Sequence, residues 1–421
     1  MDDDRQRHLL RKMFEVAVDA ATPSRLIRSY LPEKPKGRTI VLGAGKAAAA
    51  MASEVDQHMP GKVEGLVVTR YGHAVGCDHI EVVEAAHPVP DEAGRAAAAR
   101  ILKLAEEAGK DDLVLCLISG GASAVLSLPA EGISLDDKQA LNRALLDSGA
   151  DITQMNTVRK HLSAIKGGRL AAAAHPAKVV TLLISDVPGD DPAVVGSGPT
   201  VPDPTTFEDA LDIVSRFGIA KPKSVIDHLR AGRDETPKPD DPRLADAETH
   251  LIATPQASLE AAVAIALDNG IRPVVLGDSI EGEARDVAKV MAGIARQVRR
   301  HAQPAMPPCV LLSGGETTVT VKGKGRGGRN AEFLLALAIQ LAGAADIYAL
   351  AADTDGIDGS EDNAGAIVTP DTLKRATELG LNAKAALAGN DGYGFFDKLE
   401  DLVKTGPTLT NVNDFRAILI L

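Results

Sequence analysis

The chain of 421 residues contains no tryptophan, and aromatic residues make up only 3% of it. A hydrophobic core in this protein must therefore be built from alanine, valine, leucine and isoleucine. Such aliphatic cores are typical of helices packed on parallel strands. Hydrophobic residues at 45% and charged residues at 25% are ordinary for a soluble globular enzyme. The length allows two or three domains.

Cysteine is also scarce, with three widely spaced residues, Cys77, Cys116 and Cys309. Their odd number and the lack of a CxxC pair argue against a disulfide framework or a structural zinc site, so reduced thiols are expected. No apolar run is long enough to span a membrane. The N-terminal segment is charged and then amphipathic, unlike a secretory signal. We therefore expect a cytoplasmic protein with no membrane partner.

Positive charge is in the minority, because 46 lysines and arginines face 58 carboxylate residues and give a net charge of −12. This balance argues against a general nucleic-acid binder, which needs a basic surface for phosphates. The local exception is the stretch 311–332, where Lys322, Lys324, Arg326 and Arg329 fall within eight residues. Such a loop predicts a bound phosphate or carboxylate. A solvated basic hairpin is the alternative.

The same stretch contains a strand followed by the turn Ser313-Gly314-Gly315, and a helix is predicted to open at Asn330. An apolar run and a second Ser-Gly-Gly turn recur at Ser119-Gly120-Gly121. A glycine turn between strand and helix can present N–H groups to an anion. Glycine also suits any tight turn, so the repeat alone is weak. Ser119 is not a hydrolase nucleophile, because Leu117 stands where the GxSxG elbow needs glycine.

A third glycine turn, Gly43-Ala44-Gly45-Lys46, lies between a predicted strand at 39–42 and an alanine-rich helix. It matches the looser dinucleotide-binding fingerprint, but the next strand ends at Arg70 instead of the acidic residue that would hold an NAD ribose. A lysine beside a helix N-terminus is unfavourable unless an anion binds there. A lysine directed to solvent is the alternative.

Two aspartate clusters each follow an apolar strand. Asp186 and Asp190 follow the strand at 179–184, and Asp353 and Asp355 follow the strand at 347–352. Carboxylates at the carboxyl ends of parallel strands stand where α/β sheets bind ligands. Mg²⁺ prefers one or two carboxylates together with phosphate oxygens. Turn formation and helix capping are the ordinary alternative for these residues.

Further basic residues lie at 155–170, which the pattern predicts to be helical. A solvated basic face is the simpler interpretation, although Arg159 or Lys166 could reach a substrate carboxylate. His73 and His87 are predicted in loops, where contact with a ligand is the less common role.

Residues 221–247 are rich in proline and charge and are interpreted as a domain linker. We predict an N-terminal α/β domain at 1–235, beginning with a helix over 7–30, and a C-terminal α/β domain at 248–421. The expected fold is two Rossmann-like domains with mostly parallel sheets flanking a cleft.

Together the motifs resemble the glycerate 2-kinase family, whose C-terminal domain is called MOFRL. The resemblance implies ATP-dependent phosphorylation of D-glycerate to 2-phosphoglycerate with Mg²⁺, and it leaves a homodimer open. Some members are labelled hydroxypyruvate reductases, so an NAD(P)H-dependent reductase is the alternative. A non-enzymatic sugar-acid sensor would leave the aspartate clusters unexplained. The motifs, in chain order, are GAGKA from Gly43, LISGGASA from Leu117, NTVRKHLSAIKGGRLA from Asn156, ISDVPGDD from Ile184, GSGPT from Gly196, SGGETTVTVKGKGRGGRNAEF from Ser313 and ADTDGIDG from Ala352.

Phosphoryl transfer depends on positioning and charge neutralisation, and the chain lacks the P-loop pattern GxxxxGK[ST]. We expect Lys46 to neutralise the transferring group and arginine forks to bind oxygens bidentately. An aspartate would accept the hydroxyl proton. Which aspartate acts as base, which binds metal and which domain takes ATP stay open. The candidates are Lys46, Asp186, Arg326 and Asp353 for catalysis; Gly43, Gly45, Ser119, Gly120, Gly121, Ser313, Gly314, Gly315, Glu316, Arg329 and Asn330 for the cofactor; and Asp190 and Asp355 for the metal.

Overall fold

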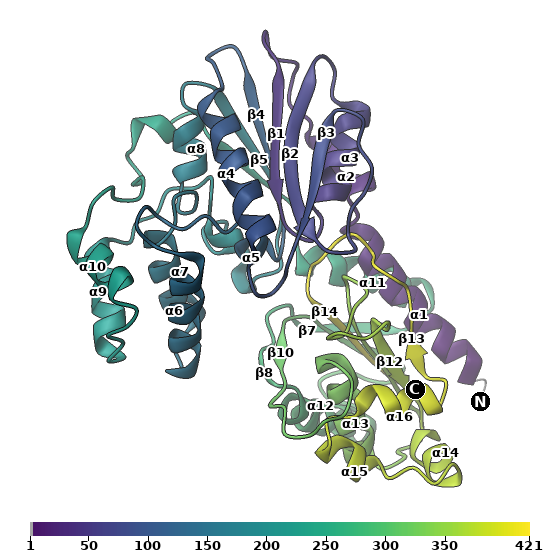
Figure 1. Cartoon of the computed structure of the whole chain (residues 1–421). Helices are drawn as coiled ribbons and strands as arrows, with labels where there is room; N and C mark the ends of the chain where they lie inside the picture. The colour runs from purple at the N-terminus through teal and green to yellow at the C-terminus, as the bar shows by residue number, and fades with distance from the viewer. Residues whose placement is uncertain (1–2) are drawn as a thin grey trace. The chain divides into compact units, whose positions relative to one another are not determined.

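A computed structural model describes residues 3–421 and divides the chain into two compact units, each with a six-stranded sheet (Figure 1). The N-terminal unit comprises Pro23–Asp186 and Asp190–Ile252, and the C-terminal unit comprises the described residues up to Thr22, Val187–Gly189 and Ala253–Leu421. The prediction of a two-domain α/β protein is confirmed. None of the helices in residues 3–421 has the length and apolar character needed to cross a membrane.

The sheet of the N-terminal unit has the strand order β3-β2-β1-β4-β5-β6. The first five strands in this order pair in parallel. Every residue of the central strands β1 and β4 is buried, as expected for aliphatic runs covered on both faces. The order is that of a doubly wound α/β sheet. The strands are β1 Thr39–Ala44, β2 Val63–Arg70, β3 Ile80–Ala85, β4 Leu113–Ile118, β5 Lys178–Ile184 and β6 Glu248–Ala253.

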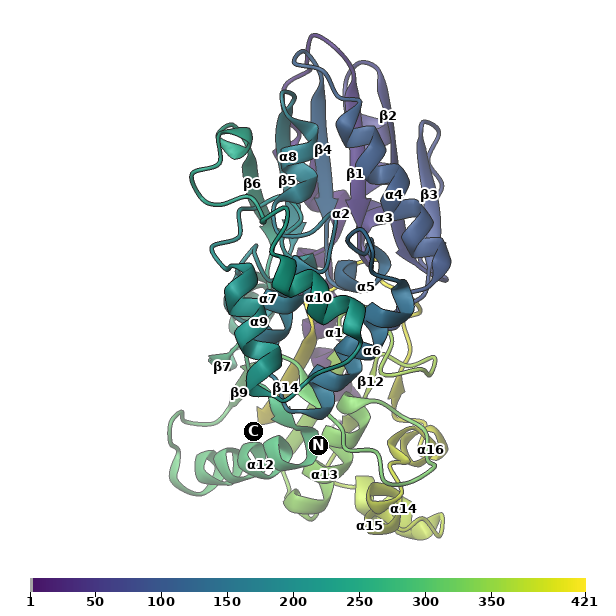
Figure 2. The same ribbon diagram turned by 60° about the vertical axis from the view of Figure 1, so that its left-hand side comes forward.

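Helices cover both faces of this sheet. The pair α2 and α3 packs on one face, and α4 and α8 pack together on the other (Figures 1 and 2). The helices of the unit are α2 Pro23–Tyr30, α3 Ala48–His58, α4 Glu92–Glu106, α5 Ala122–Val125, α6 Leu135–Asp147, α7 Ile152–His161, α8 Arg169–Ala174, α9 Phe207–Arg216 and α10 Lys223–Ala231.

Four of these helices, α6, α7, α9 and α10, form a bundle with a hydrophobic core of its own (Figure 2). The bundle contains Val225, Ile226 and Leu229 from the segment 221–247. The interpretation of that segment as a linker is therefore wrong. Its proline-rich part is also anchored, because the hydroxyl of Thr236 donates to the buried carboxylate of Asp203 at 3.2 Å.

The sheet of the C-terminal unit has the order β13-β12-β11-β14-β9-β7. Only β7 and β9 pair in parallel, and the other neighbours are antiparallel. The prediction of mostly parallel sheets is wrong for this unit, because the last strand of the chain, β14, inserts between β9 and β11 in the opposite direction. The strands are β7 Arg272–Gly277, β8 Gly282–Glu283, β9 Cys309–Ser313, β10 Thr317–Thr318, β11 Ile347–Asp353, β12 Gly365–Val368, β13 Leu402–Val403 and β14 Asp414–Ile420.

Side chains on each strand of this sheet alternate between two hydrophobic layers. In β11, Ile347 and Ala349 face the layer of α12 and α13, whereas Tyr348 and Leu350 face the layer of α1 and α11. The helices of the unit are α1 Asp3–Ala20, α11 Pro255–Asp268, α12 Ala284–His301, α13 Arg329–Leu341, α14 Thr372–Glu378, α15 Ala383–Ala388 and α16 Gly392–Lys398.

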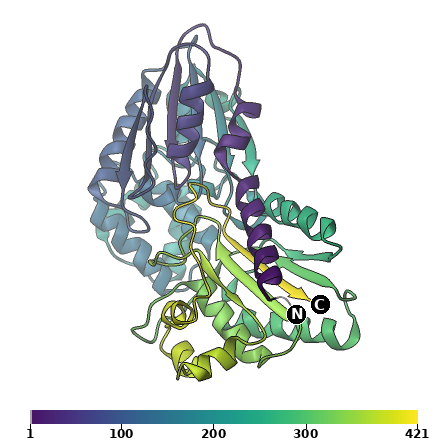
Figure 3. The same ribbon diagram turned by 90° about the vertical axis from the view of Figure 1, so that its right-hand side faces the viewer.

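Helix α1 belongs to the C-terminal unit, although it opens the chain. It packs on α11 and on the sheet (Figure 3). Its apolar side chains join the core there, and the ring centroids of Phe14 and Phe415 lie 5.9 Å apart. The predicted domain 1–235 is therefore wrong for its first helix. The predicted helix over 7–30 is also interrupted, because α1 ends at Ala20 and a new helix starts at Pro23, a residue suited to the first helical position.

A Phe14→Ala substitution tests this assignment. Phe14 is 1% exposed, and truncating such a side chain costs about 3 to 5 kcal/mol of unfolding free energy. Hydrogen exchange should show lost protection in β11 and β14 and unchanged protection in β1 and β4. The control Lys12→Ala, on the exposed side of the same helix, should change stability by no more than about 0.5 kcal/mol. Equal loss of protection in both sheets would contradict the assignment.

Candidate active site

Two glycine turns meet at the carboxyl ends of β1 and β4. The parallel register pairs Ala44 with Ile118. The residues that follow in each turn, Gly45 and Ser119, therefore come side by side. Gly45 has φ 124°, and a Cβ atom on it would lie 2.3 Å from Ser119 Oγ, so only glycine fits there. The strand order reverses direction between these two strands, and α/β sheets bind ligands at such a switch point.

Hydrogen bonds hold the two turns together. The N–H of Lys46 donates to the carbonyl oxygen of Gly120 at 2.8 Å, and the N–H of Ala47 donates to Ser119 Oγ at 3.0 Å. These N–H groups are engaged within the protein, so the first turn does not offer them to an anion. In contrast, the N–H groups of Gly120 and Gly121 donate to no acceptor within residues 3–421. The second turn keeps donors that a ligand can use.

Lys46 lies between the first turn and helix α3. The helix starts without a side-chain cap, and its positive end beside a lysine favours a bound anion. Lys46 is half-buried, and its Cγ would lie 3.2 Å from a Cβ on Gly121. The structure thus brings Lys46 together with the second turn. Gly43 is a residue of β1, where a Cβ would lie 2.7 Å from the carbonyl oxygen of Leu117; it permits close strand packing.

A pocket of about 200 Å³ adjoins these turns and shares Gly121 and His87 with them. Three cationic side chains line it, Lys138, Arg159 and Lys166. The two lysines are buried and the arginine is half-buried. Within residues 3–421 no carboxylate oxygen lies within 4.0 Å of any of these three cations. The interpretation of this segment as a solvated basic face is therefore wrong.

Each of the three cations has one neutral hydrogen-bond partner. Lysine carries three donors and arginine five, so each keeps donors to spare. The bonds run from Lys138 Nζ to Ser127 Oγ at 3.2 Å, from Lys166 Nζ to the carbonyl oxygen of Ser123 at 2.6 Å and from Arg159 Nε to Asn142 Oδ1 at 3.2 Å.

Burial and mutual repulsion perturb these groups. Burial, followed by the charge of Arg159, lowers the pKa of Lys138 to about 7. Burial, followed by the charges of Lys138 and Arg159, also lowers the pKa of Lys166 well below its usual value. Strong perturbation beside a cleft is typical of functional sites. Sequence analysis missed Lys138, because one lysine in an amphipathic helix carries no local signal of burial.

The aspartate cluster after β5 lies in the same unit. Asp186 is half-buried. Asp190 has φ 55°, uncommon for a residue other than glycine, and its Oδ1 is buried with no hydrogen-bond partner in residues 3–421. A buried carboxylate oxygen without a donor is costly unless something pairs with it. Asp190 is therefore the candidate metal ligand with the clearest structural support.

The Ser-Gly-Gly turn of the C-terminal unit serves packing. Ser313 ends β9, and a Cβ on Gly315 would lie 2.2 Å from the backbone nitrogen of Ile280. The carbonyl oxygen of Gly314 accepts a hydrogen bond from Arg416 at 3.0 Å. A Cβ on Gly314 would lie 3.3 Å from the carbonyl oxygens of Asp278 and Asp414, so neighbouring backbone restricts both glycine positions.

Arg329 lies at the first position of α13, surrounded by carboxylates. Its three nitrogens donate to Asp414 Oδ1 at 2.7 Å, Asp353 Oδ2 at 2.8 Å and Glu316 Oε1 at 2.5 Å. Burial opposes its charge, but Asp414, Asp353 and Glu316 raise the pKa of Arg329 well above its usual value. In this arrangement the guanidinium fork of Arg329 is occupied by carboxylates, and bidentate binding of phosphate by Arg329 stays a prediction. Glu316 is its exposed partner.

The buried residues around Arg329 cap helix α13. Asp358 accepts from the N–H groups of Asn330 at 2.9 Å and Ala331 at 2.8 Å. Burial raises the pKa of Asp358 to about 6, although these donors favour its charged form. The side chain of Asn330 donates to Asp414 Oδ1 at 2.8 Å. The backbone N–H and the Nδ2 of Asn330 are thus partnered, whereas its Oδ1 is buried with no hydrogen-bond partner in residues 3–421.

The remaining predicted residues of this unit divide into buried and exposed groups. Asp353 and Asp355 are buried. Asp353 Oδ1 accepts from the N–H of Asp355 at 3.0 Å, and Asp355 Oδ1 accepts from the N–H of Ile357 at 2.8 Å. Arg326 is exposed, lies 4.5 Å over the ring of Tyr393 and pairs with a glutamate at 3.1 Å. None of these contacts joins Arg326 to Asp353 or Asp355.

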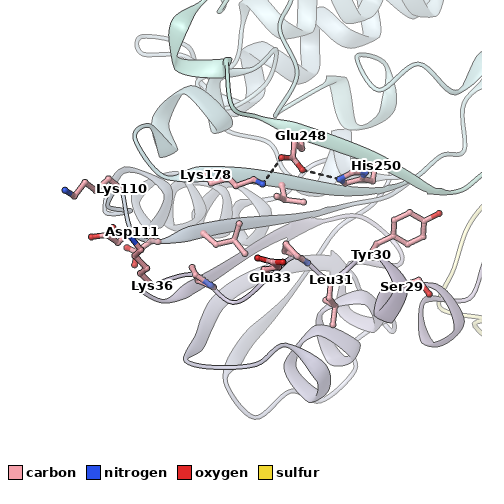
Figure 4. A pocket seen from close by; sticks show the side chains of 15 residues that line it. Ser29, Tyr30, Leu31, Glu33, Lys36, Lys110, Asp111, Lys178, Glu248 and His250 are labelled. Atoms are coloured by element: carbon pink, nitrogen blue, oxygen red, sulfur yellow. Dashed lines mark ion pairs between the residues drawn. The ribbon is translucent and has the colours of Figure 1, made fainter.

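A cavity of about 640 Å³ lies at the amino ends of β4, β5 and β6. Figure 4 shows Glu248 paired there with Lys178 at 2.7 Å and with His250 at 3.6 Å. Ligands of α/β sheets bind at the carboxyl ends instead, and the ion pairs satisfy these charges. Elsewhere, no group of three or more His, Cys, Asp or Glu residues suited to a metal ion occurs within residues 3–421.

Comparison with known protein families identifies two regions. Residues 9–230 match a domain family described as a domain of unknown function, DUF4147, and residues 309–414 match the MOFRL family. A relative from Agrobacterium vitis, named "Putative hydroxypyruvate reductase", is 54% identical over 100% of this chain and 95% of its own.

A second relative, the D-glycerate 2-kinase of Thermotoga maritima, is 41% identical over 98% of both chains. The crystal structure of glycerate kinase from Thermotoga maritima matches 99% of this chain and 100% of its own, with a TM-score of 0.89 and 40% identity. The resemblance stated from the motifs is confirmed over the whole length.

A Lys138→Met variant tests the unpaired buried charge. The pKa of Lys138 is about 7 in the folded protein and has its usual, higher value in the unfolded chain. Below about pH 7 Lys138 is charged in both states, so burying its charge destabilises the folded protein by the full amount. As pH rises toward the usual lysine pKa, the folded state binds fewer protons than the unfolded state and this destabilisation disappears. The variant should therefore unfold at a higher temperature than wild type near pH 6. The gain corresponds to at most on the order of 5 kcal/mol, at about 1.4 kcal/mol per pH unit of pKa shift.

Calorimetric melting near pH 6 and near pH 10 checks this result, and the gain should shrink at the higher pH. The exposed Arg143 on the same helix supplies the control, since Arg143→Gln should show no such pH dependence. A Lys138→Met variant that is less stable at both pH values would mean that the lysine is compensated in the folded protein.

Proposed function

Because this chain belongs to the glycerate kinase family that combines the DUF4147 and MOFRL domains, we infer that it is a glycerate 2-kinase that transfers a phosphoryl group from ATP to D-glycerate. The observation that carries the inference is the cationic edge of the N-terminal sheet. There Lys46, the donors of Gly120 and Gly121 and a pocket with three cations lie at the carboxyl ends of β1 and β4. Such an edge suits anionic substrates and a developing phosphoryl charge.

We assign Lys46 to neutralise charge on the transferring phosphoryl group. A lysine acts as a point charge and needs no bidentate geometry. The N–H groups of Gly120 and Gly121 would donate to phosphate or carboxylate oxygens, because nothing within the described chain accepts from them. Arg326 stays a proposed second cation, and its side chain is exposed.

We propose Asp186 as the group that accepts the hydroxyl proton, with Asp353 as the alternative. Both oxygens of Asp353 already accept hydrogen bonds, one from Arg329 and one from the N–H of Asp355. Donors to a carboxylate stabilise its charged form and make it a poorer base. Asp186 directly follows β5 and belongs to the same unit as Lys46.

Mg²⁺ is proposed as the companion of ATP. The buried Oδ1 of Asp190, which has no donor in residues 3–421, fits one ligand position of such an ion. When bound, Mg²⁺ would neutralise negative charge on the phosphate oxygens. Asp355, in the C-terminal unit, stays a proposed metal ligand.

The alternative, an NAD(P)H-dependent hydroxypyruvate reductase, is suggested by the name of the Agrobacterium vitis relative and by the glycine turn after β1. Two observations oppose it. In a dinucleotide site the glycine gives the pyrophosphate close access to the backbone, but here the space beside Gly45 is filled by Ser119 Oγ. In addition, β2 ends at Arg70, where a carboxylate for the ribose is expected.

The purified protein should release ADP from ATP and Mg²⁺ only when D-glycerate is present, and the product should carry phosphate on the 2-hydroxyl. Oxidation of NADH and NADPH with hydroxypyruvate, measured beside it, should stay at background. Reductase activity without kinase activity would overturn the proposal.

Lys46→Ala should lower kcat by about 100- to 1,000-fold, because it removes preorganised charge from the transition state. Arg326→Ala should also lower kcat, with little change in Tm since the side chain is exposed. Lys324→Ala, in the same exposed loop, is the matched control for Arg326. Steady-state kinetics and thermal melts check both substitutions. Wild-type turnover in either variant would remove that residue from the mechanism.

A further inference from the structure

The buried cations of the pocket beside Gly121 come from three separate segments. Lys138 lies on α6, Arg159 on α7, and Lys166 in the turn before α8. The neighbouring Lys160 shows how the same fold treats an ordinary buried lysine, since its Nζ pairs with the buried carboxylate of Asp203 at 3.4 Å. Burying like charges without a carboxylate is costly. Because Lys160 is paired and the three pocket cations have no carboxylate partner within the described chain, we infer that the pocket binds an anion from outside the chain.

The donors that remain define what the anion looks like. The hydrogen bonds of the two lysines and of Arg159 are to neutral oxygens. Both terminal nitrogens of Arg159 have no acceptor within residues 3–421. A guanidinium fork of this kind matches the two oxygens of a carboxylate. The pocket thus offers one planar guanidinium fork and two lysine amino groups to a single small anion.

Size and position restrict the ligand further. A volume of about 200 Å³ is below the roughly 300 to 1,000 Å³ of pockets for drug-sized ligands, so a nucleotide does not fit inside. Gly121 connects the pocket to Lys46, because a Cβ on Gly121 would lie 3.2 Å from both His87 Nε2 and Lys46 Cγ. An acid held by its carboxylate in this pocket can therefore extend its hydroxyl end toward Lys46.

We propose that Lys138, Arg159 and Lys166 form the subsite for the carboxylate of the acceptor substrate, a short 2-hydroxy acid. The identity of the ligand as D-glycerate rests on the proposed kinase function. The preference of the pocket for an anion does not depend on that function. The three cations select a carboxylate-bearing substrate, and the shortness of the pocket selects a small one. Neutral polyols such as glycerol lack the charge that repays the burial of these groups.

Binding should also take up a proton. In the unliganded protein Lys138 faces Arg159 on α7, Lys166 after it and His87 before α4, and no acidic residue lines the pocket. A bound carboxylate favours the charged form of Lys138, whose pKa otherwise lies at about 7. The affinity for D-glycerate should therefore fall as pH rises from about 7 to about 9.

The test measures D-glycerate binding by titration calorimetry without ATP, beside steady-state kinetics. Arg159→Met and Lys138→Met should each weaken D-glycerate binding and raise its KM on the order of 10- to 100-fold, with the KM for ATP changed less than about two-fold. Arg143→Gln, exposed on α6, should leave both constants at the wild-type value. Because the substitutions remove unpaired buried charge, the folded state is expected to persist, which thermal melts check.

The arms of the test separate the possible failures. Wild-type KM for D-glycerate in both pocket variants would overturn the assignment. Inorganic phosphate that binds more tightly than D-glycerate, with loss of that binding in the variants, would assign the pocket to a phosphate group and overturn it too. D-glycerate binding that the variants abolish, in a protein without glycerate-dependent ADP release, would support the subsite and refute the kinase.

Discussion

The N-terminal unit depends on the contact between the turns that follow β1 and β4. Parallel pairing of Ala44 with Ile118 places Gly45 against Ser119, and the 2.3 Å that a Cβ would leave requires glycine at that position. The hydrogen bonds from Lys46 and Ala47 then fix the start of α3. This one contact determines the position of Lys46 and the orientation of the second turn. It thereby also determines the wall of the cationic pocket at Gly121.

The two units use charge in opposite ways. In the N-terminal unit, three cationic residues are buried or half-buried without a carboxylate partner in the described chain. In the C-terminal unit, the fork of Arg329 is saturated by Asp353, Asp414 and Glu316. That network holds the start of α13 in place and satisfies its own charges. This difference is why we propose the first region as a binding site, whereas the charges of the second compensate one another.

Much of the fold could be read from the residues. The aliphatic runs, the glycine turns and the aspartates after strands identified the strands and the family, because these features are local. Predictions failed where distant segments meet. The insertion of β14 between β9 and β11 changed the expected parallel sheet into a mixed one. The apolar stripe of α1 predicted a helix, but it did not predict which helix α1 packs against, which is α11.

The candidate site divides in the same way. The sequence alone determined the kinds of groups available: glycine turns with donors, lysine at a helix start and carboxylates after strands, since backbone conformation and residue chemistry are properties of short segments. Only the tertiary structure decided which charges are compensated. It gave Arg329 three carboxylates and gave Lys138, Arg159 and Lys166 none within 4.0 Å in the described chain. Whether a charge is paired depends on neighbours brought together by folding from distant segments, and no local pattern encodes them.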